Sequence, residues 1–498
     1  MKIRIYLIWL LMAILQISCN SDYLDTVPTD KLSDQVIFTS VEGAQTVLDG
    51  ISRTMRAAGQ YHDQFGVKTI DLAMDMMSED IALSAFHWFG ADYQFANHMA
   101  NLPRTLYTWS LYYTIIYNAS TVIANTGQIE SGSAAQKNNL KAQAYTLRAY
   151  AYFQLVQLYQ FTYKGNENAL AVPVYTENDL KGAGDHAKGS EGGLSGKPRA
   201  TVAGVYSRIT ADLDEAARLF SESALPRRHI SDVTLQVAKG LRARVALVMN
   251  DWEKAASMAG EARQGYTLMT PAQYSLGFDN ATKQNWMWGL VVNDEQSTTF
   301  GSWVSHMDWS IGGYCGFGLS RKSWSLSLYN RMDDRDIRKK LVDITQYDPS
   351  TTKNWIVPNK FSAGKGKQFS ADLVMMRPEE MILIEAEAKA RLNRTDEARA
   401  LLKQLRDQRY ETPVMITSSG NDLIEEILLE RRIELWGEGF AALDLKRLKR
   451  GIDRNNSNHL PLVAREMSVS ASDNRWNYKI PQAEIDANPQ INAEHQNP

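Results

Sequence analysis

The feature that most constrains this chain is a pattern of small and apolar residues that occurs twice, each time at helical spacing. The first copy is Ala243, Asn250, Trp252, Ala255 and Ala262, and the second is Ala386, Asn393, Thr395, Ala398 and Leu405. In both copies, two alanines lie twelve positions apart across a turn, a spacing that lets paired helices approach closely. The repeat therefore predicts a scaffold of stacked helix pairs.

Apolar residues at positions i, i+3, i+4 and i+7 extend this helical pattern over much of the chain. We expect the scaffold mainly in residues 40–58, 106–160, 200–264 and 377–450, and an irregular region mainly in residues 60–104 and 265–370. Long structured loops in a compact protein usually carry function. The predicted fold class is all-α, or mainly α: a tetratricopeptide-like helical repeat scaffold with a large, loop-rich ligand-binding region.

The N-terminus has the pattern of a lipoprotein signal peptide. Two basic residues precede an apolar run from Ile5 to Ile17, which is shorter than the roughly 20 residues of a membrane-spanning helix. A small residue followed by Cys19 is similar to a lipobox, although Gln16 departs from the usual pattern. We expect residues 1–18 to be removed and Cys19 to carry acyl chains such as palmitate, which leaves one domain of residues 19–498. A plain secretory signal is the alternative.

Charge and cysteine content exclude several classes of protein. There are 54 Lys and Arg residues against 57 Asp and Glu, so the net charge of −3 argues against a general nucleic-acid binder and against a polybasic membrane anchor. Only Cys19 and Cys315 are present. If Cys19 carries lipid, no disulfide and no thiolate zinc site can form. We expect no metal and no cofactor.

Motifs for catalysis are weak. Asp333, Asp334 and Asp336 offer paired carboxylates, but neighbours in sequence seldom flank a glycosidic bond from opposite sides. The glycine-rich stretch at residues 182–196 lacks the Lys-Ser/Thr pair of a phosphate-binding loop. We therefore expect no catalytic residue and no enzymatic activity, and a surface glycosidase remains the less favoured alternative.

Two aromatic clusters in the irregular region are the candidate ligand site. The candidate residues are Trp88, Asp92 and Tyr93 in the first cluster, and Trp303, Asp308, Trp309 and Tyr314 in the second. An exposed Trp face can stack on a sugar ring while neighbouring polar side chains bond the hydroxyl groups. The alternative for each ring is packing in the core. That alternative is favoured for Trp286 and Trp288, which alternate like one face of a strand.

Several longer motifs resemble the SusD/RagB family of outer-membrane nutrient-binding lipoproteins. They are the opening at 22–28, the helix at 144–155, the charged motif at 430–439 and the closing motif at 480–489. The charged motif, which begins Glu430-Arg431-Arg432, is the most specific. Its charges lie at helical spacing, and we expect them to be structural.

The resemblance implies a non-catalytic surface lipoprotein in the outer membrane of a Gram-negative, Bacteroidota-like cell. Such a protein captures a glycan through aromatic loops and delivers it to a SusC-like TonB-dependent transporter, and nucleic acid is not a partner. Two other interpretations stay open. One is a RagB-like protein that binds peptide on the same type of transporter. The other is a lid that has lost its own ligand site.

Overall fold

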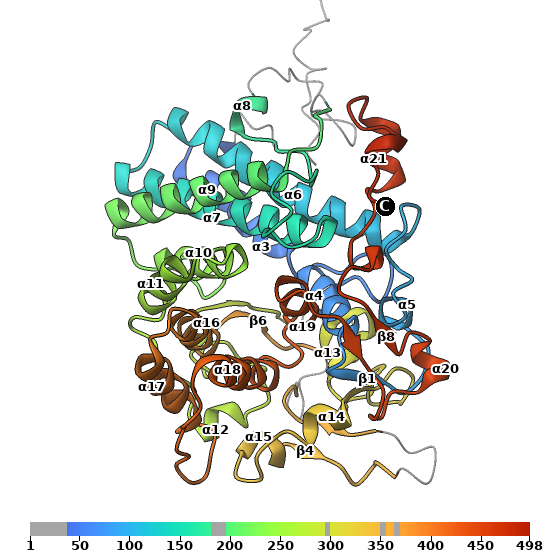
Figure 1. The fold of residues 1–498 in the computed structure, drawn as a ribbon. Helices are drawn as coiled ribbons and strands as arrows, with labels where there is room; N and C mark the ends of the chain where they lie inside the picture. The colour runs from blue at the N-terminus through green and yellow to red at the C-terminus, as the bar shows by residue number, and fades with distance from the viewer. Residues whose placement is uncertain (1–36, 181–195, 294–298, 349–354, 363–368) are drawn as a thin grey trace, which may run out of the picture.

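The computed structural model describes residues 37–180, 196–293, 299–348, 355–362 and 369–498 (Figure 1). Long helices form one side of the molecule, and short helices, short strands and loops form the other. The predicted signal peptide and the lipidation site at Cys19 lie outside the described residues. Within the described part, no helix is both long enough and apolar enough to cross a bilayer.

The scaffold consists of antiparallel helices that pack mostly in chain order. Its members are α3 (Val41–Thr54), α6 (Pro103–Asn125), α7 (Ala134–Tyr159), α9 (Val202–Ser223), α10 (Leu235–Met249), α11 (Trp252–Ala262), α16 (Pro378–Arg391), α17 (Thr395–Arg406) and α18 (Gly420–Glu434). Ser40, Ser133, Thr201 and Thr234 cap the first turns of α3, α7, α9 and α10 by accepting a backbone N–H. Helix α11 packs against α16, so segments more than one hundred residues apart in the sequence continue the same stack.

The two copies of the small-residue repeat adopt the same geometry, which confirms the predicted helix pairs. Helices α10 and α11 form one pair, and α16 and α17 form the other. Asn250 and Asn393 follow α10 and α16 with φ angles of 62° and 60°. This left-handed conformation, which asparagine tolerates, reverses the chain between the paired helices. Ala255 and Ala398 are fully buried at the crossings.

The remaining helices are short. They are α4 (Val67–Met76), α5 (Gly90–Tyr93), α8 (Glu177–Leu180), α12 (Pro271–Tyr274), α13 (Trp303–Met307), α14 (Leu326–Tyr329), α15 (Ile337–Lys340), α19 (Ala441–Arg447), α20 (Pro461–Ala464) and α21 (Gln482–Ala487). Helix α4 lies within residues 60–104, which were expected to be mainly irregular. Nine of its ten residues are buried, among them Lys68 and Asp75 of its short polar stripe.

The short strands form two-stranded antiparallel sheets. The pairs are β1 (Ile81–Leu83) with β3 (Lys322–Trp324), β2 (Trp288–Leu290) with β6 (Leu373–Met376), β4 (Val342–Asp343) with β5 (Val357–Pro358), and β7 (Ile452–Asp453) with β8 (Ser468–Val469). In the first pair Ile81 lies opposite Trp324 and Leu83 opposite Lys322, so the loops after β1 and before β3 lie side by side. Trp286 and Trp288 are buried in the core, as their alternation predicted.

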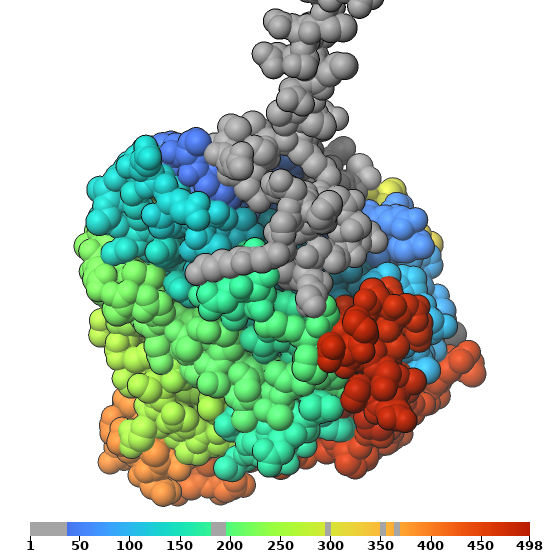
Figure 2. All heavy atoms as spheres, turned by 90° about the horizontal axis from the view of Figure 1, so that it is seen from above, coloured from blue at the N-terminus to red at the C-terminus, as the bar shows by residue number. Residues whose placement is uncertain are grey.

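The C-terminal segment folds back onto the long helices, and Figure 2 shows it in red beside the green and cyan helices. The Asn497 side chain donates to the backbone carbonyls of Tyr159 and Tyr478, at 2.7 Å each. The short helix α21 forms within this segment. Helix α21 has no fully buried residue and is only six residues long, so it carries little of the apolar pattern that predicts a helix.

A buried ion network joins α16, α18 and the loop segments, as expected for a structural charged motif. Glu434 on α18 accepts hydrogen bonds from Arg338, Arg377 and Arg409. All four side chains are at most 1% exposed. These three guanidinium groups hold the pKa of the Glu434 carboxyl well below its usual range, despite the burial that opposes ionisation.

Candidate functional site

Six aromatic side chains from segments far apart in the sequence meet at the surface. We call this cluster the aromatic platform, and its members are His62, His87, Trp88, Phe300, Tyr314 and Phe317. Phe317 is 62% exposed, and both histidines are exposed, whereas Trp88 and Phe300 are half-buried and Tyr314 is buried, at 8% exposed. Next to the platform, Phe86 is 58% exposed. The cluster therefore presents a broad, shallow aromatic surface and not a closed cavity.

Tyr314 is the centre of the platform. Its ring lies 6.1 Å from Trp88 in an edge-on arrangement, 5.3 Å from Phe300 and 5.2 Å from His87, measured between centroids. Its hydroxyl is hydrogen-bonded to Nδ1 of His62 at 2.7 Å. Edge-on and tilted contacts of this kind stabilise aromatic clusters and leave ring faces and edges available.

Short backbone contacts fix the loops that carry the rings. The β1–β3 pairing places the loop with His87 and Trp88 against the segment before Lys322, and Ser320 Oγ donates to the Trp88 carbonyl at 3.0 Å. The ring of Phe317 lies over Gly312, where a Cβ atom would stand 2.8 Å from it. Glycine at this position therefore lets the Phe317 ring approach the backbone closely.

Two buried titratable groups lie directly beneath the platform. His306 on α13 stacks against Tyr314, with 4.9 Å between centroids and 18° between planes, and its Nε2 lies 2.9 Å from the His62 carbonyl. Lys322 Nζ lies 3.4 Å from His306 Nδ1 and donates to the carbonyl and Oγ of Ser320. Burial lowers the pKa of Lys322 to about 7. Burial and the nearby lysine lower the pKa of His306 well below its usual range.

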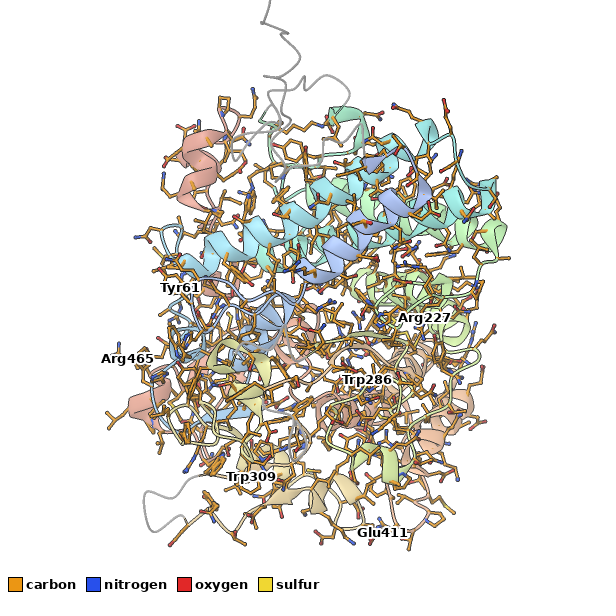
Figure 3. The ribbon with its side chains drawn as sticks, turned by 180° about the vertical axis from the view of Figure 1, so that it is seen from behind. Tyr61, Arg227, Trp286, Trp309, Glu411 and Arg465 are labelled. Atoms are coloured by element: carbon orange, nitrogen blue, oxygen red, sulfur yellow. The ribbon has the colours of Figure 1, made fainter. Side chains whose placement is uncertain are left out.

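Of the seven candidate ligand-binding residues, the structure brings Trp88 and Tyr314 together in the platform. Trp309 is 37% exposed but lies apart from it, where its Nε1 donates to the Asn359 side chain and its ring meets Trp355 edge-on at 6.2 Å. Figure 3 shows Trp309 and Tyr61, the neighbour of His62, on the side of the molecule away from Arg227.

Four other candidates are buried, as Tyr314 is, which corrects the expectation that these side chains are offered to a ligand. Asp92 is 1% exposed and accepts from Arg104 and Asn97, and Tyr93 is fully buried beneath the Arg454 guanidinium at 4.1 Å. Trp303 is 4% exposed and packs edge-on against Phe361, at 4.6 Å between centroids.

Asp308 is the fourth buried candidate, at 1% exposed, and it accepts from the N–H and hydroxyl of Ser310 at 2.7 Å. Each of these four side chains instead orders the loops on which the exposed rings lie.

Sequence reasoning missed four platform residues. One is His87, the neighbour of the candidate Trp88. Phe300 and Phe317 lie in the same glycine-rich stretch as Tyr314. They would have been found if phenylalanine had been counted there as a ligand-stacking residue alongside tryptophan. His62 carries no local signal, because only the fold brings it within 2.7 Å of a residue 252 positions away.

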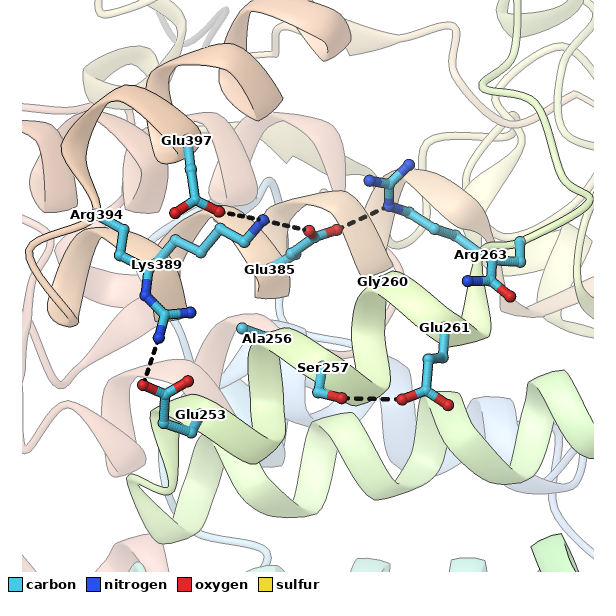
Figure 4. A pocket seen from close by; sticks show the side chains of 11 residues that line it. Glu253, Ala256, Ser257, Gly260, Glu261, Arg263, Glu385, Lys389, Arg394 and Glu397 are labelled. Carbon is cyan, nitrogen blue, oxygen red and sulfur yellow. Dashed lines mark hydrogen bonds and ion pairs between the residues drawn. The ribbon is translucent and has the colours of Figure 1, made fainter.

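Two hollows of the surface lie away from the platform and have a different chemistry. One, of about 530 Å³, lies between α11 and α16 and is lined by Glu253, Glu385, Lys389 and Arg394, among others (Figure 4). Its charges pair with one another, as in Lys389 with Glu385 at 2.8 Å. A second, of about 450 Å³, lies beside the start of α10 and includes Arg227 and Tyr266. The first hollow, between α11 and α16, has no aromatic lining residue with which to stack a sugar ring.

Metal chemistry finds no support in the described residues, which contain no group of three or more His, Cys, Asp or Glu side chains placed to hold an ion. Cys315 is buried, and burial raises the pKa of its thiol to about 11, so the thiol is protonated at neutral pH.

Comparison with known proteins gives consistent matches. The profile of the SusD family matches residues 321–498, and the profile of a family described as starch-binding and associating with the outer membrane matches residues 22–247. Two SusD-like proteins of Formosa agariphila are 20% and 26% identical, over 69% of this chain and 72% and 71% of theirs.

Solved structures agree with the sequence matches. The chain is similar to a SusD-like carbohydrate-binding protein from Bacteroides vulgatus, with a TM-score of 0.80 and 26% identity over 92% of this chain and 98% of that one. It also shares its fold with a SusD superfamily protein from Bacteroides thetaiotaomicron, with a TM-score of 0.75 and 22% identity over 92% of this chain and 100% of that one.

Proposed function

The chain belongs to the SusD-like family of non-catalytic, carbohydrate-binding proteins associated with the outer membrane, and from that premise we propose that it captures a glycan on its aromatic platform. The observation that carries the proposal is the convergence of five exposed or half-buried rings around the buried Tyr314. Ring faces pack against the C–H groups of a sugar, while the outward edges of His62 and His87 are placed to bond its hydroxyl groups.

The shallow shape of the platform favours an oligo- or polysaccharide over a small, enclosed ligand. A chain of sugar units can lie across Trp88, Phe300 and Phe317 and continue beyond them, whereas a closed pocket selects one short ligand. Affinity on such a surface is modest, because stacking and a few hydroxyl bonds offset only a limited ordering cost. Modest affinity suits a protein that must release its ligand.

Delivery to a SusC-like TonB-dependent transporter completes the proposal. In this proposal Cys19 tethers the mature chain, residues 19–498, to the outer membrane as a surface lipoprotein, and the ligand passes from the platform to the transporter. A RagB-like peptide-binding role is the second candidate. The aromatic platform favours the glycan, since extended peptides bind mainly through backbone pairing at strand edges.

The test is a binding screen with the chain from Asn20 onward, which contains every described residue. The panel contains oligosaccharides of starch, xylan, mannan, β-glucan and pectin, with a pool of peptides alongside. We expect a glycan to bind, and we expect Trp88→Ala and Phe317→Ala each to weaken its binding by about three- to tenfold.

Met415→Ala is the matched control, because Met415 is an apolar side chain that is 86% exposed and lies between α17 and α18. It should leave the affinity unchanged. Binding of peptides alone would select the RagB-like function. A glycan that binds equally well to Phe317→Ala and Trp88→Ala would move the site away from the platform, and turnover of the bound glycan would contradict a binding protein.

A further inference from the structure

The lower face of the aromatic platform rests on one histidine that holds two of its members. The His306 ring lies parallel to Tyr314 at 4.9 Å, and its Nε2 lies 2.9 Å from the backbone carbonyl of His62. A carbonyl oxygen only accepts, so His306 Nε2 carries a hydrogen and donates it. His306 therefore supports the Tyr314 ring from below and fixes the backbone of the loop that presents the His62 ring.

Lys322 completes this arrangement from the other side of His306. With its hydrogen on Nε2, the neutral His306 ring offers Nδ1 as an acceptor, and Lys322 Nζ lies 3.4 Å from it. The same ammonium donates to the carbonyl and hydroxyl oxygens of Ser320, at 3.0 and 2.8 Å. Ser320 Oγ in turn donates to the carbonyl of Trp88 at 3.0 Å. One polar chain thus connects the backbones or rings of His62, Trp88 and Tyr314.

An ammonium group in this position is costly to the fold. The Lys322 side chain is fully buried, and it makes no ion pair with a carboxylate among the described residues. A buried charge without an opposite charge destabilises a protein, so a methionine of similar volume would be the more stable choice. Costs of this kind are concentrated where function requires them.

We propose that Lys322 and His306 are positioning residues of the ligand site, which set the spacing and orientation of His62, Tyr314 and Trp88 from beneath and so determine the affinity of the platform for its glycan. The proposal rests on the proposed function for the identity of the ligand. The geometry of the support is independent of it. Neither side chain touches the ligand, because both are fully buried.

The first test is Lys322→Met, which removes the ammonium and keeps the length of the side chain. Its affinity for the tightest-binding oligosaccharide of the panel should fall at least tenfold, while its midpoint of thermal unfolding stays equal or rises. If Lys322 were only structural, Lys322→Met would lower the affinity and the midpoint of thermal unfolding together.

The second test is the pH dependence of that affinity. The titratable groups that face the His306–Lys322 pair are Asp63, His87, Arg104 and Cys315. Burial raises the pKa of Cys315 to about 11, so its thiol stays neutral across this range. Burial brings the pKa of Lys322 to about 7, and the neutral amine has two N–H donors for the three acceptors that the ammonium satisfies. Wild-type affinity should therefore fall as pH rises through 7. Lys322→Met should lack that component and keep only the titration of the exposed histidines.

The third test separates the two functions of His306. His306→Phe retains a ring beneath Tyr314 but cannot donate to the His62 carbonyl, whereas His306→Gln retains an N–H near the position of Nε2. We expect His306→Gln to bind the oligosaccharide more tightly than His306→Phe.

Lys446→Met is the matched control for a buried lysine. Burial also brings the pKa of Lys446 to about 7, but its ammonium bonds the carbonyls of Gln157, Gln160 and Trp476 at the end of α7. The folded Lys446→Met variant should bind with wild-type affinity.

Hydrogen exchange decides the proposal even without a ligand. Lys322→Met should speed amide exchange in residues 59–66 and 84–90 and leave α10 and α16 unchanged. If both exchange and affinity of Lys322→Met match the wild type, the positioning role is overturned while the function stands. If no oligosaccharide binds but exchange changes as expected, the proposed function fails and the support geometry stands.

Discussion

The helical scaffold and the loops beneath the aromatic platform both bury charged side chains, but they stabilise them differently. In the scaffold, Glu434 meets Arg338, Arg377 and Arg409, so each charge faces its opposite. Beneath the platform, Lys322 donates to neutral acceptors on His306 and Ser320 and lies over the Phe89 ring at 5.4 Å. The first arrangement holds charges ionised over a wide pH range, whereas the second brings a lysine pKa down to about 7.

The difference shows which part of the protein is held in one arrangement and which part depends on pH. Opposite charges in fixed geometry lock the helices into one arrangement, because removal of either partner leaves an uncompensated buried charge. Neutral hydrogen-bond partners tolerate either protonation state, so the loops that carry Trp88 and Tyr314 depend on a group that titrates near neutral pH. We therefore expect the scaffold to dominate stability and the platform to dominate binding.

The largest expected effect is on the free energy of unfolding, and it tests the ion network of the scaffold. Glu434→Gln removes the charge that faces three buried guanidinium groups, so the free energy of unfolding should fall by about 3–5 kcal/mol. Urea unfolding followed by circular dichroism measures it. The control is Glu222→Gln, which breaks an exposed pair with Arg218 and should lower the free energy of unfolding far less. Equal losses of unfolding free energy in Glu434→Gln and Glu222→Gln would show that the buried network stabilises the scaffold no more than an exposed pair does.

The next effect has the opposite sign and tests the loop side. Unfolded lysine stays protonated up to about pH 10, whereas burial lowers the pKa of folded Lys322 to about 7. Between these values the unfolded chain binds more protons, so wild-type stability should rise with pH there. Lys322→Met should therefore be more stable by on the order of 1–3 kcal/mol at pH 6, and the gain should shrink toward pH 10. Thermal unfolding at pH 6 and 9.5 measures it, and a loss of stability at pH 6 would contradict the unpaired-charge account.

A smaller effect tests whether the two helix pairs are equivalent. Asn250 and Asn393 both adopt positive φ angles, which alanine disfavours by about 1–2 kcal/mol. Asn250→Ala and Asn393→Ala should therefore cost similar amounts in urea unfolding. Glycine tolerates this conformation, so Asn393→Gly should stay within a few tenths of a kcal/mol of the wild type. Very different costs for the two alanine variants would show that the repeat is not energetically uniform.

The smallest expected effect on stability is at an exposed ring of the platform, where binding and stability should separate. Phe317 is 62% exposed, so Phe317→Ala should change the free energy of unfolding by less than about 0.5 kcal/mol even though it weakens glycan binding. Thermal unfolding and titration calorimetry on the same preparation measure both quantities. A large stability loss would mean that Phe317 is part of the core, and binding data on the other platform variants would then need the same stability correction.

Prediction from sequence succeeded where local pattern and environment coincide. The repeat around Asn250 and Asn393 fixed the helix pairs, because small residues at helical spacing pack in one way. It missed α4, because the helix is only ten residues long and its polar stripe of Lys68, Asp71 and Asp75 is therefore short. The sequence predicted that the aromatic loops form the ligand site. It did not predict which of their rings are exposed, because a run of aromatic residues carries no information on what covers each one.

The amino-acid sequence by itself determined the mainly helical scaffold and the family to which the chain belongs, since both rest on patterns within short stretches of chain. The tertiary structure alone decided which aromatic residues meet. His62 and Tyr314 lie 252 positions apart and touch through a 2.7 Å hydrogen bond, while Trp303 lies close in sequence to the exposed Phe317 and is buried. The physical reason is that exposure and contact depend on which distant segments cover a side chain, and no local period encodes that.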